Sequence, residues 1–396
     1  MRLLRAAAVA SALGIVAATV FVPTPAVSAA LACEAGRVVT EVPWAQRMLA
    51  PERVWTHATG RGVTVAVIDS AVDGNHRQLR GRVEKLMDYL PPASPASCVA
   101  HGTEVSSIIA AQRVSGVGFR GLAPDAKILP VRVSDRIEGN GATVDPPTFA
   151  RAIREAAARP GVRVMNISLV LSTDDPLVRA AIADVVAADI VVVAAVGNNH
   201  ANDDTPFTDP PSFPAAYPGV LGVGAIAETG ELLPQSQVGS YVDVVAPGAD
   251  ILVATPIEGH TVESGTSFAA PFVAATAALI REERPTATAS QVVSRIIATA
   301  NPSRGGPGYG TGIVDPYRAV TEVLAGEDPE ALPEAPAPVV DPAAERREAR
   351  WRELGGISLA LFGIGIGLVI AIVVGTSVYR RGTSRGWRAT RAPRTP

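Results

Sequence analysis

The sequence is poor in aromatic residues and in charge. Aromatic side chains make up 5% of the 396 residues and charged ones 18%, and the formal net charge at pH 7 is −3. So weak a charge gives no reason to expect a nucleic acid as a partner. Apolar residues make up 47% of the chain, which is enough for one large globular core with flanking segments.

The sequence also lacks the acidic pattern of a calcium-binding loop. Asp203, Asp204 and Asp209 lie close together in the chain, but they have the character of a solvated loop rather than the spacing of metal ligands. We therefore expect no obligatory metal and no cofactor.

The N-terminus has the pattern of a secretory signal peptide. A charged start, Met1 to Arg5, is followed by the uncharged run Ala6 to Val22, and small residues then offer cleavage after Ala29 or Ala30. We therefore expect the body of the protein to be exported. An uncleaved anchor and a lipid on Cys33 remain alternatives, because the residues before Cys33 faintly resemble a lipoprotein box.

A second apolar segment lies near the C-terminus. Residues 355–379 contain no charged side chain, and at about 1.5 Å per helical residue they are long enough to cross a hydrocarbon core about 30 Å thick. Residues 380–396 carry six arginines and no acid. The positive-inside rule places such a tail in the cytoplasm, so an exported body tethered to the cell membrane by one transmembrane helix is expected.

Between these ends, apolar β-branched runs alternate with helical patterns. This alternation predicts an α/β fold with a mainly parallel sheet and helices on both faces. Strands are expected at 63–70, 128–133, 162–171, 190–196, 220–227 and 242–246, and helices at 105–111, 148–159, 176–188, 272–280 and 290–300.

A single serine stands at the start of a helix that is apolar all round. The sequence Ser264-Gly265-Thr266-Ser267-Phe268-Ala269-Ala270-Pro271 precedes the Ala-rich run 272–280. At a helix N-terminus, free backbone N–H groups and the positive end of the helix dipole can stabilise an oxyanion. Ser267 is therefore a candidate nucleophile, although a simple N-cap role is the commoner explanation of an isolated Gly-Thr-Ser.

A serine nucleophile needs a base, and the base needs a carboxylate to orient it. Asp69 ends the buried-type strand Val63-Thr64-Val65-Ala66-Val67-Ile68, and His101 opens a helical stretch in which Gly102 leaves room beside it. Either residue alone is more often a cap or turn residue. Together with Ser267, they form a candidate catalytic set.

These three motifs, Val-Ile-Asp69-Ser, His101-Gly-Thr and Gly-Thr-Ser267-Phe-Ala-Ala-Pro, resemble the three signatures of the subtilisin-like serine proteases. The order Asp, His, Ser along the chain is also that of this family. An α/β-hydrolase elbow is disfavoured, because Ala269 stands where Gly-x-Ser-x-Gly requires the second glycine. The resemblance implies a subtilisin-like fold and endopeptidase activity on proteins or peptides, with Asp69, His101 and Ser267 as the catalytic residues.

The resemblance also assigns roles around the nucleophile. Asn198, after the strand ending Ala194-Ala195-Val196-Gly197, would be the side-chain donor of the oxyanion hole. The pocket for the residue before the scissile bond would lie between that strand end and the segment Ser168-Leu169-Val170. Val170 and Val196 stand where the family commonly has Gly and Ala. The bulkier valines would narrow the pocket, so we expect the substrate residue before the scissile bond to be small, such as Ala.

The full layout resembles the mycosins, membrane-anchored subtilases of actinobacterial type VII secretion systems. It implies either an endopeptidase acting on exported proteins, or mainly a structural component of the secretion membrane complex with secondary proteolysis. The expected parts are a signal peptide (1–30), an extension that wraps the catalytic domain (31–60), the peptidase domain (61–326), a Pro-rich linker and juxtamembrane segment (327–354), the transmembrane helix (355–379) and a cytoplasmic tail (380–396).

Cys33 and Cys98 are the only cysteines and hence the only possible pair. In an exported chain an even number of cysteines favours a disulfide, which would pin the start of the mature protein to the loop before His101. Closing a loop of this size is expected to stabilise the fold by about 4 kcal/mol. Mass spectrometry of the unreduced protein should find the two peptides joined; two free thiols, or a lipid on Cys33, would contradict this prediction.

Overall fold

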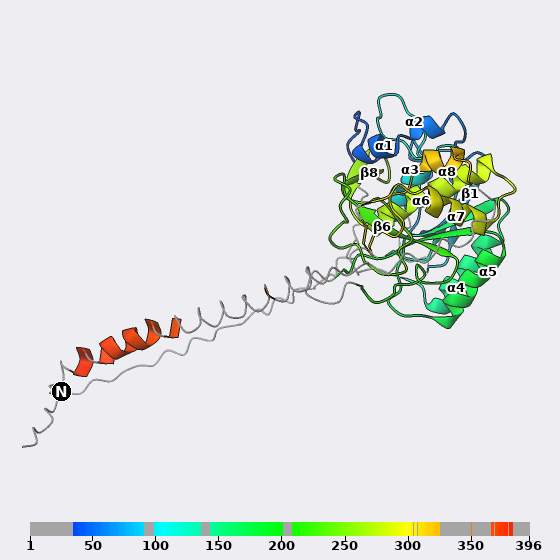
Figure 1. Cartoon of the computed structure of the whole chain (residues 1–396). Coiled ribbons are helices and arrows are strands. Elements are labelled where there is room, and N and C mark those ends of the chain that lie inside the picture. Colours follow the sequence, from blue (N-terminus) through cyan, green and yellow to red (C-terminus); the bar gives the residue numbers. More distant parts are fainter. Residues whose placement is uncertain are drawn as a thin grey trace, which may run out of the picture. The chain divides into compact units, whose positions relative to one another are not determined.

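Seven parallel strands form one central sheet in the computed structural model (Figure 1). The structure describes residues 35–90, 99–135, 143–200, 208–324 without 304 and 307, 350, and 366–382 without 368 and 379. The mainly parallel α/β fold is thereby confirmed. In sheet order the strands are β2 (Met87–Asp88), β3 (Lys127–Arg132), β1 (Thr64–Asp69), β4 (Val162–Ile167), β5 (Val191–Ala195), β6 (Val220–Ile226) and β7 (Val244–Pro247).

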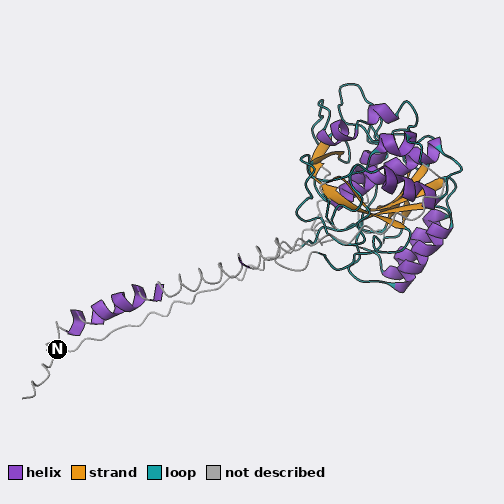
Figure 2. Ribbon diagram, in the orientation of Figure 1, coloured by secondary structure: helices purple, strands orange, loops and turns teal. Residues whose placement is uncertain are grey.

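Helices cover both faces of this sheet (Figure 2). The helices α4 (Pro146–Ala157) and α5 (Pro176–Ala187) pack side by side on one face. On the other face lie α3 (His101–Ala110) and α6 (Thr266–Glu283), with α7 (Ala289–Thr299) and α8 (Pro316–Thr321) beside α6. Each of the helices expected at 105–111, 148–159, 176–188, 272–280 and 290–300 thus exists, with shifted ends.

The alternation of side chains along β1 decides where its last residue points. Val65 and Val67 belong to the core cluster that contains α3 and α6, whereas Ala66 and Ile68 belong to the cluster on the α4 and α5 side. Because successive side chains of a strand point to opposite faces, Asp69 falls on the α3 and α6 side. The candidate base and nucleophile lie on those two helices.

The helix α6 runs through the core against β1, β4, β5, β6 and β7. Its small side chains let it approach the sheet closely, and every residue from Thr266 to Arg281 is buried. The sequence pattern predicted a helix only over 272–280, whereas the structure begins it at Thr266. Ser267 therefore lies in the first turn of α6, which agrees with its expected place at a helix N-terminus.

The strand β4 is shorter than expected and ends at Ile167. Beyond it the chain leaves the sheet, and Leu171 exchanges backbone hydrogen bonds with Phe213 instead (N···O 2.7 and 2.9 Å). The expected strand 162–171 therefore comprises a sheet strand and a separate segment that turns toward Ser267.

A hairpin of β8 (Ile251–Ala254) and β9 (His260–Glu263) was not predicted from the sequence. The outer edge of β9 is met by the N-terminal extension, where Arg37 and His260 exchange backbone hydrogen bonds. The approach is close: a Cβ on Gly36 would lie 2.4 Å from the His260 carbonyl oxygen. At this point the extension lies directly against the catalytic domain.

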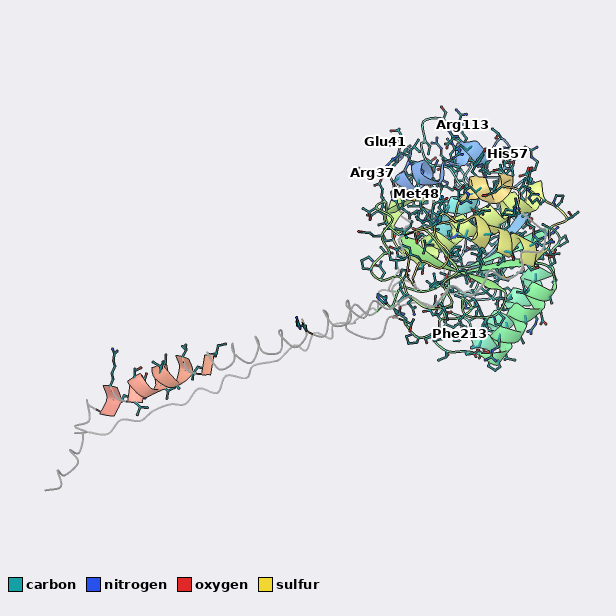
Figure 3. The ribbon with its side chains drawn as sticks, in the orientation of Figure 1. Arg37, Glu41, Met48, His57, Arg113 and Phe213 are labelled. Carbon is teal, nitrogen blue, oxygen red and sulfur yellow. The ribbon has the colours of Figure 1, made fainter. Side chains whose placement is uncertain are left out.

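The extension continues through α1 (Trp44–Leu49) and α2 (Pro51–Val54). In Figure 3 the labelled residues of the extension, Arg37, Glu41, Met48 and His57, lie on one side of the catalytic domain, and Phe213 lies on the opposite side. The end of the extension is held by Glu282 of α6, whose carboxylate oxygen accepts the backbone N–H groups of Thr59, Gly60 and Arg61 at 2.6, 2.5 and 2.9 Å.

The chain divides into two units, residues 1–328 and 329–396. In the second unit the described residues 366–367, 369–378 and 380–382 are helical. Among the described stretches of the chain, no helix combines the length and hydropathy of a membrane span. The expected signal peptide, Cys33 and Cys98 lie outside the described residues, so the signal peptide and the disulfide stay predictions.

Replacing Glu282 with Ala should destabilise the protein by about 1 to 3 kcal/mol, because the part-buried N–H groups of Thr59 and Gly60 and the exposed N–H of Arg61 lose their acceptor. The measurement is the urea midpoint of the full-length protein. Glu283→Ala is the matched control, since its side chain is exposed on the same helix. Equal midpoints for the two variants would show that the carboxylate does not anchor the extension.

Candidate active site

A buried carboxylate and an imidazole form the centre of the site. Asp69 is 1% exposed, and its Oδ1 lies 2.7 Å from His101 Nδ1 while also accepting the Ser70 N–H at 2.6 Å. Burial lowers the pKa of His101, but the nearby Asp69 carboxylate outweighs that cost and holds this pKa above its ordinary value of 6.5. The imidazole is therefore oriented and made more basic by the same carboxylate.

Ser70 sets the position of His101. Its hydroxyl accepts the Gly102 N–H at 2.8 Å and donates to the Val99 carbonyl at 3.2 Å, which ties the start of α3 to the end of β1. A Cβ on Gly102 would lie 2.5 Å from the Ser70 carbonyl oxygen. Only glycine permits so close an approach, which confirms the expected need for room beside His101.

Ser267 is the second residue of α6 and is 9% exposed. The next residue, Phe268, packs edge-on against the His101 ring with centroids 5.3 Å apart. Within the described residues no hydrogen bond joins the Ser267 hydroxyl to His101; such contacts commonly tighten only when substrate binds. As a first-turn amide, the Ser267 N–H has no acceptor within the helix and remains available.

The amide of Asn198 is fixed in a definite orientation. Its Oδ1 accepts the Thr266 N–H at 2.9 Å and the Thr266 hydroxyl at 3.1 Å. The amide NH2 is therefore directed away from Thr266. A Cβ added to Gly265 would lie 3.1 Å from Asn198 Nδ2 and 3.4 Å from Ser267 Oγ, so both groups border the same small space.

Ser168, the residue after β4, contacts Ser267 from the end of the strand. Because Pro271 has no N–H, the Ser267 carbonyl lacks its normal donor four residues later in the helix. The Ser168 hydroxyl supplies one instead at 3.0 Å and accepts from Asn166 Nδ2 at 2.9 Å. Pro271 thus leaves the Ser267 carbonyl without a donor inside the helix, and Ser168, 99 positions earlier, supplies that donor.

The expected pocket walls differ in their exposure. Val170 is 37% exposed, and its Cγ1 would lie 3.6 Å from a Cβ on Gly197, so its side chain stands between the two walls. Ala194, Ala195 and Val196 are buried within the core and present almost no side-chain surface. In this structure any narrowing of the pocket therefore comes from Val170 alone.

Three further residues border this region and carry no sequence signal. The buried Ser212 hydroxyl donates to the Val196 carbonyl at 2.5 Å, and Phe213 beside it pairs with Leu171, so this segment links both walls. A Cβ on Gly197 would lie only 2.0 Å from the Gln237 side-chain oxygen. Only these contacts between distant parts of the chain identify the residues as neighbours of the pocket.

The profile of the subtilase family matches residues 60–322. Mycosin-1 of Mycobacterium tuberculosis (strain ATCC 25618 / H37Rv) is 34% identical, covering 87% of this chain and 86% of that relative. Subtilisin NAT of Bacillus subtilis subsp. natto is 35% identical, with 65% of each chain covered. A solved structure of the serine protease MycP1, described as an essential component of the type VII (ESX-1) secretion system, has a TM-score of 0.62 and 33% identity, covering 73% of this chain and 92% of that one.

The chain therefore belongs to the subtilase family of serine proteases and, within it, to the mycosins. It is a subtilisin-like serine endopeptidase, as the sequence motifs predicted.

Thr266→Val should lower kcat by about tenfold with little change in KM, because Asn198 Oδ1 loses one of its two hydrogen bonds from Thr266. A factor of ten in rate corresponds to about 1.4 kcal/mol. Thr266→Ser retains the hydroxyl and should keep nearly full activity. Steady-state kinetics on one peptide compares the two. Equal kcat values for Val and Ser would mean that the hydroxyl does not orient the amide.

Proposed function

We propose that Asp69, His101 and Ser267 act as the catalytic triad, with Asn198 in the oxyanion hole. The observation that carries this proposal is the 2.7 Å bond between the buried Asp69 and His101, on the face of the sheet where α6 presents Ser267. Asp69 holds the imidazole in the tautomer whose other nitrogen can accept a proton.

In the proposed reaction His101 takes the proton of the Ser267 hydroxyl as its oxygen attacks the scissile carbonyl. The Asn198 NH2 and the Ser267 N–H stabilise the oxyanion. His101 then gives the proton to the leaving amine, the acyl-enzyme forms, and water releases the acid in a second cycle. No other group of the chain is needed for these steps.

We also propose that the protein works at the cell membrane with a type VII secretion complex. Support comes from the mycosin relatives, among them MycP1, described as an essential component of such a system. The uncharged segment 355–379 would be the single membrane span, with the catalytic domain outside and residues 380–396 in the cytoplasm. A mainly structural role in the complex is the second candidate, favoured by that same description of MycP1.

Ser267→Ala should abolish peptide cleavage and labelling by a fluorophosphonate probe, while the urea midpoint stays unchanged. Comparable turnover by this variant would remove the proposed mechanism. Secretion measured in cells carrying the variant separates the two candidate functions. Export that survives loss of the nucleophile supports the structural role, and export that fails supports the proteolytic one.

The pocket before the scissile bond should prefer a small residue such as Ala. The half-exposed Val170 adds stiff, branched volume between the walls, and overpacking typically costs about 1 to 3 kcal/mol. Phe should therefore be disfavoured by about tenfold or more. Val170→Gly is expected to broaden acceptance in a peptide library; a wild-type preference for Phe over Ala would contradict the prediction.

A further inference from the structure

The side chain of Gln237 borders the pocket proposed above for the residue before the scissile bond. Its backbone N–H donates to the Gly197 carbonyl at 3.0 Å, which holds Gln237 beside the pocket wall that ends at Asn198. A Cβ on Gly197 would lie 2.0 Å from Gln237 Oε1 and 3.6 Å from Val170 Cγ1. The amide oxygen and the valine methyl group therefore border one space between the two walls.

Contacts on its far side set the orientation of the Gln237 amide. Its Nε2 lies 3.4 Å from the Pro210 carbonyl oxygen and 3.4 Å from the Tyr241 hydroxyl oxygen, and that hydroxyl donates to the same carbonyl at 3.1 Å. A carbonyl oxygen can only accept a hydrogen bond, so the NH2 group and not the amide oxygen faces Pro210. The amide oxygen is therefore directed to Gly197.

This amide oxygen has no partner in the protein. Gln237 as a whole is 6% exposed, and within the part of the chain that the structure describes no group donates a hydrogen bond to Oε1. The oxygen is nevertheless not one of the side-chain atoms that are shielded from solvent and lack a partner. An unpaired amide oxygen that keeps contact with solvent is open to a donor from outside the chain.

The segment that links the two walls also supports this amide. Its residue Pro210 faces the Gln237 NH2 group, and its residue Ser212 donates to the Val196 carbonyl of one wall. Because Gln237 is 6% exposed and Val170 is 37% exposed, the amide oxygen lies deeper between the walls than the valine does. A substrate side chain that enters past Val170 therefore meets an acceptor oxygen.

An acceptor at this place distinguishes side chains by their chemistry as well as their size. A side chain with an O–H or N–H group can pair with Oε1, whereas an apolar side chain of equal size would cover the oxygen and leave it without a partner. Pockets built around a hydrogen bond reject an analogue that lacks the bond more strongly than apolar pockets reject a wrong size.

We propose that Gln237 is a specificity-determining residue whose amide oxygen selects a hydrogen-bond donor, such as the hydroxyl of Ser, on the substrate residue before the scissile bond. This proposal rests on the triad and the pocket proposed above. It adds a preference that is separate from the size limit set by Val170, because it distinguishes side chains of the same volume.

The test uses the full-length protein and two quenched peptides that differ only in the residue before the scissile bond, Ser or α-aminobutyrate. These side chains have nearly the same volume, so narrowing by Val170 cancels from the ratio of the two kcat/KM values. Wild type should prefer Ser by about fivefold or more. Gln237→Leu keeps a similar volume but removes the acceptor, and should bring the ratio to one or below.

Gln237→Asn and Gln235→Leu complete the comparison. The Asn side chain is one methylene shorter, so it stays polar but withdraws its oxygen from Gly197, and the ratio should fall. Gln235→Leu is the matched control, since within the described residues only its backbone carbonyl, which accepts the His200 N–H at 3.1 Å, forms a hydrogen bond. It should leave the ratio unchanged. If the Gln237→Leu chain does not fold, Gln237→Asn carries the test.

A wild-type ratio of one or less, or a ratio that neither Gln237 variant alters, would overturn the proposal. Labelling of wild type with a fluorophosphonate probe reports separately on Ser267. An unlabelled wild-type protein would count against the triad and not against the role of Gln237. In that case product peptides that end in Ser or α-aminobutyrate are titrated against the Ser267→Ala chain, with tighter binding of the Ser peptide expected and equal binding contradicting the proposal.

Discussion

The packing of α6 against the sheet is the constraint on which the rest of the structure depends. Five of the seven parallel strands contact this helix, and its alanines allow that approach. A helix surrounded on all sides cannot shift or rotate without opening cavities in the core. Its N-terminus is therefore a fixed point in the molecule. This one helix sets the positions of Ser267, of the Ser267 backbone N–H that lies near Asn198, and of the strand β9 before it.

A large part of the fold and of the site could be predicted from the sequence. Asp69 and Asn198 each follow a β-branched run, and Ser267 precedes an Ala-rich one, so local pattern alone gave their places at the ends of elements. The parallel sheet followed from the alternation of strands and helices. The boundaries were less accurate, because α6 begins six residues earlier than its apolar run and β4 stops where Ser168 turns toward Ser267.

What could not be predicted depends on contacts between distant positions. Glu282 accepts N–H groups more than 220 positions earlier, and its exposed neighbour Glu283 has the same local pattern. Val196 fits a pocket wall by its place in the motif, yet the structure buries it in the core. Glu104 stands in the first turn of a helix, where acids are common as helix-dipole partners. Only its burial distinguishes it from such an ordinary acid.

The contact between Arg37 and His260 has a consequence for solubility. A strand edge with free N–H and C=O groups is a template for pairing with another chain. The strand β9 has β8 on one edge, and the extension covers part of the other through Gly36 and Arg37. Val262, which is 52% exposed on this strand, would otherwise add an apolar contact. By covering this edge of β9, the extension hinders its pairing with the same edge of another copy of the chain.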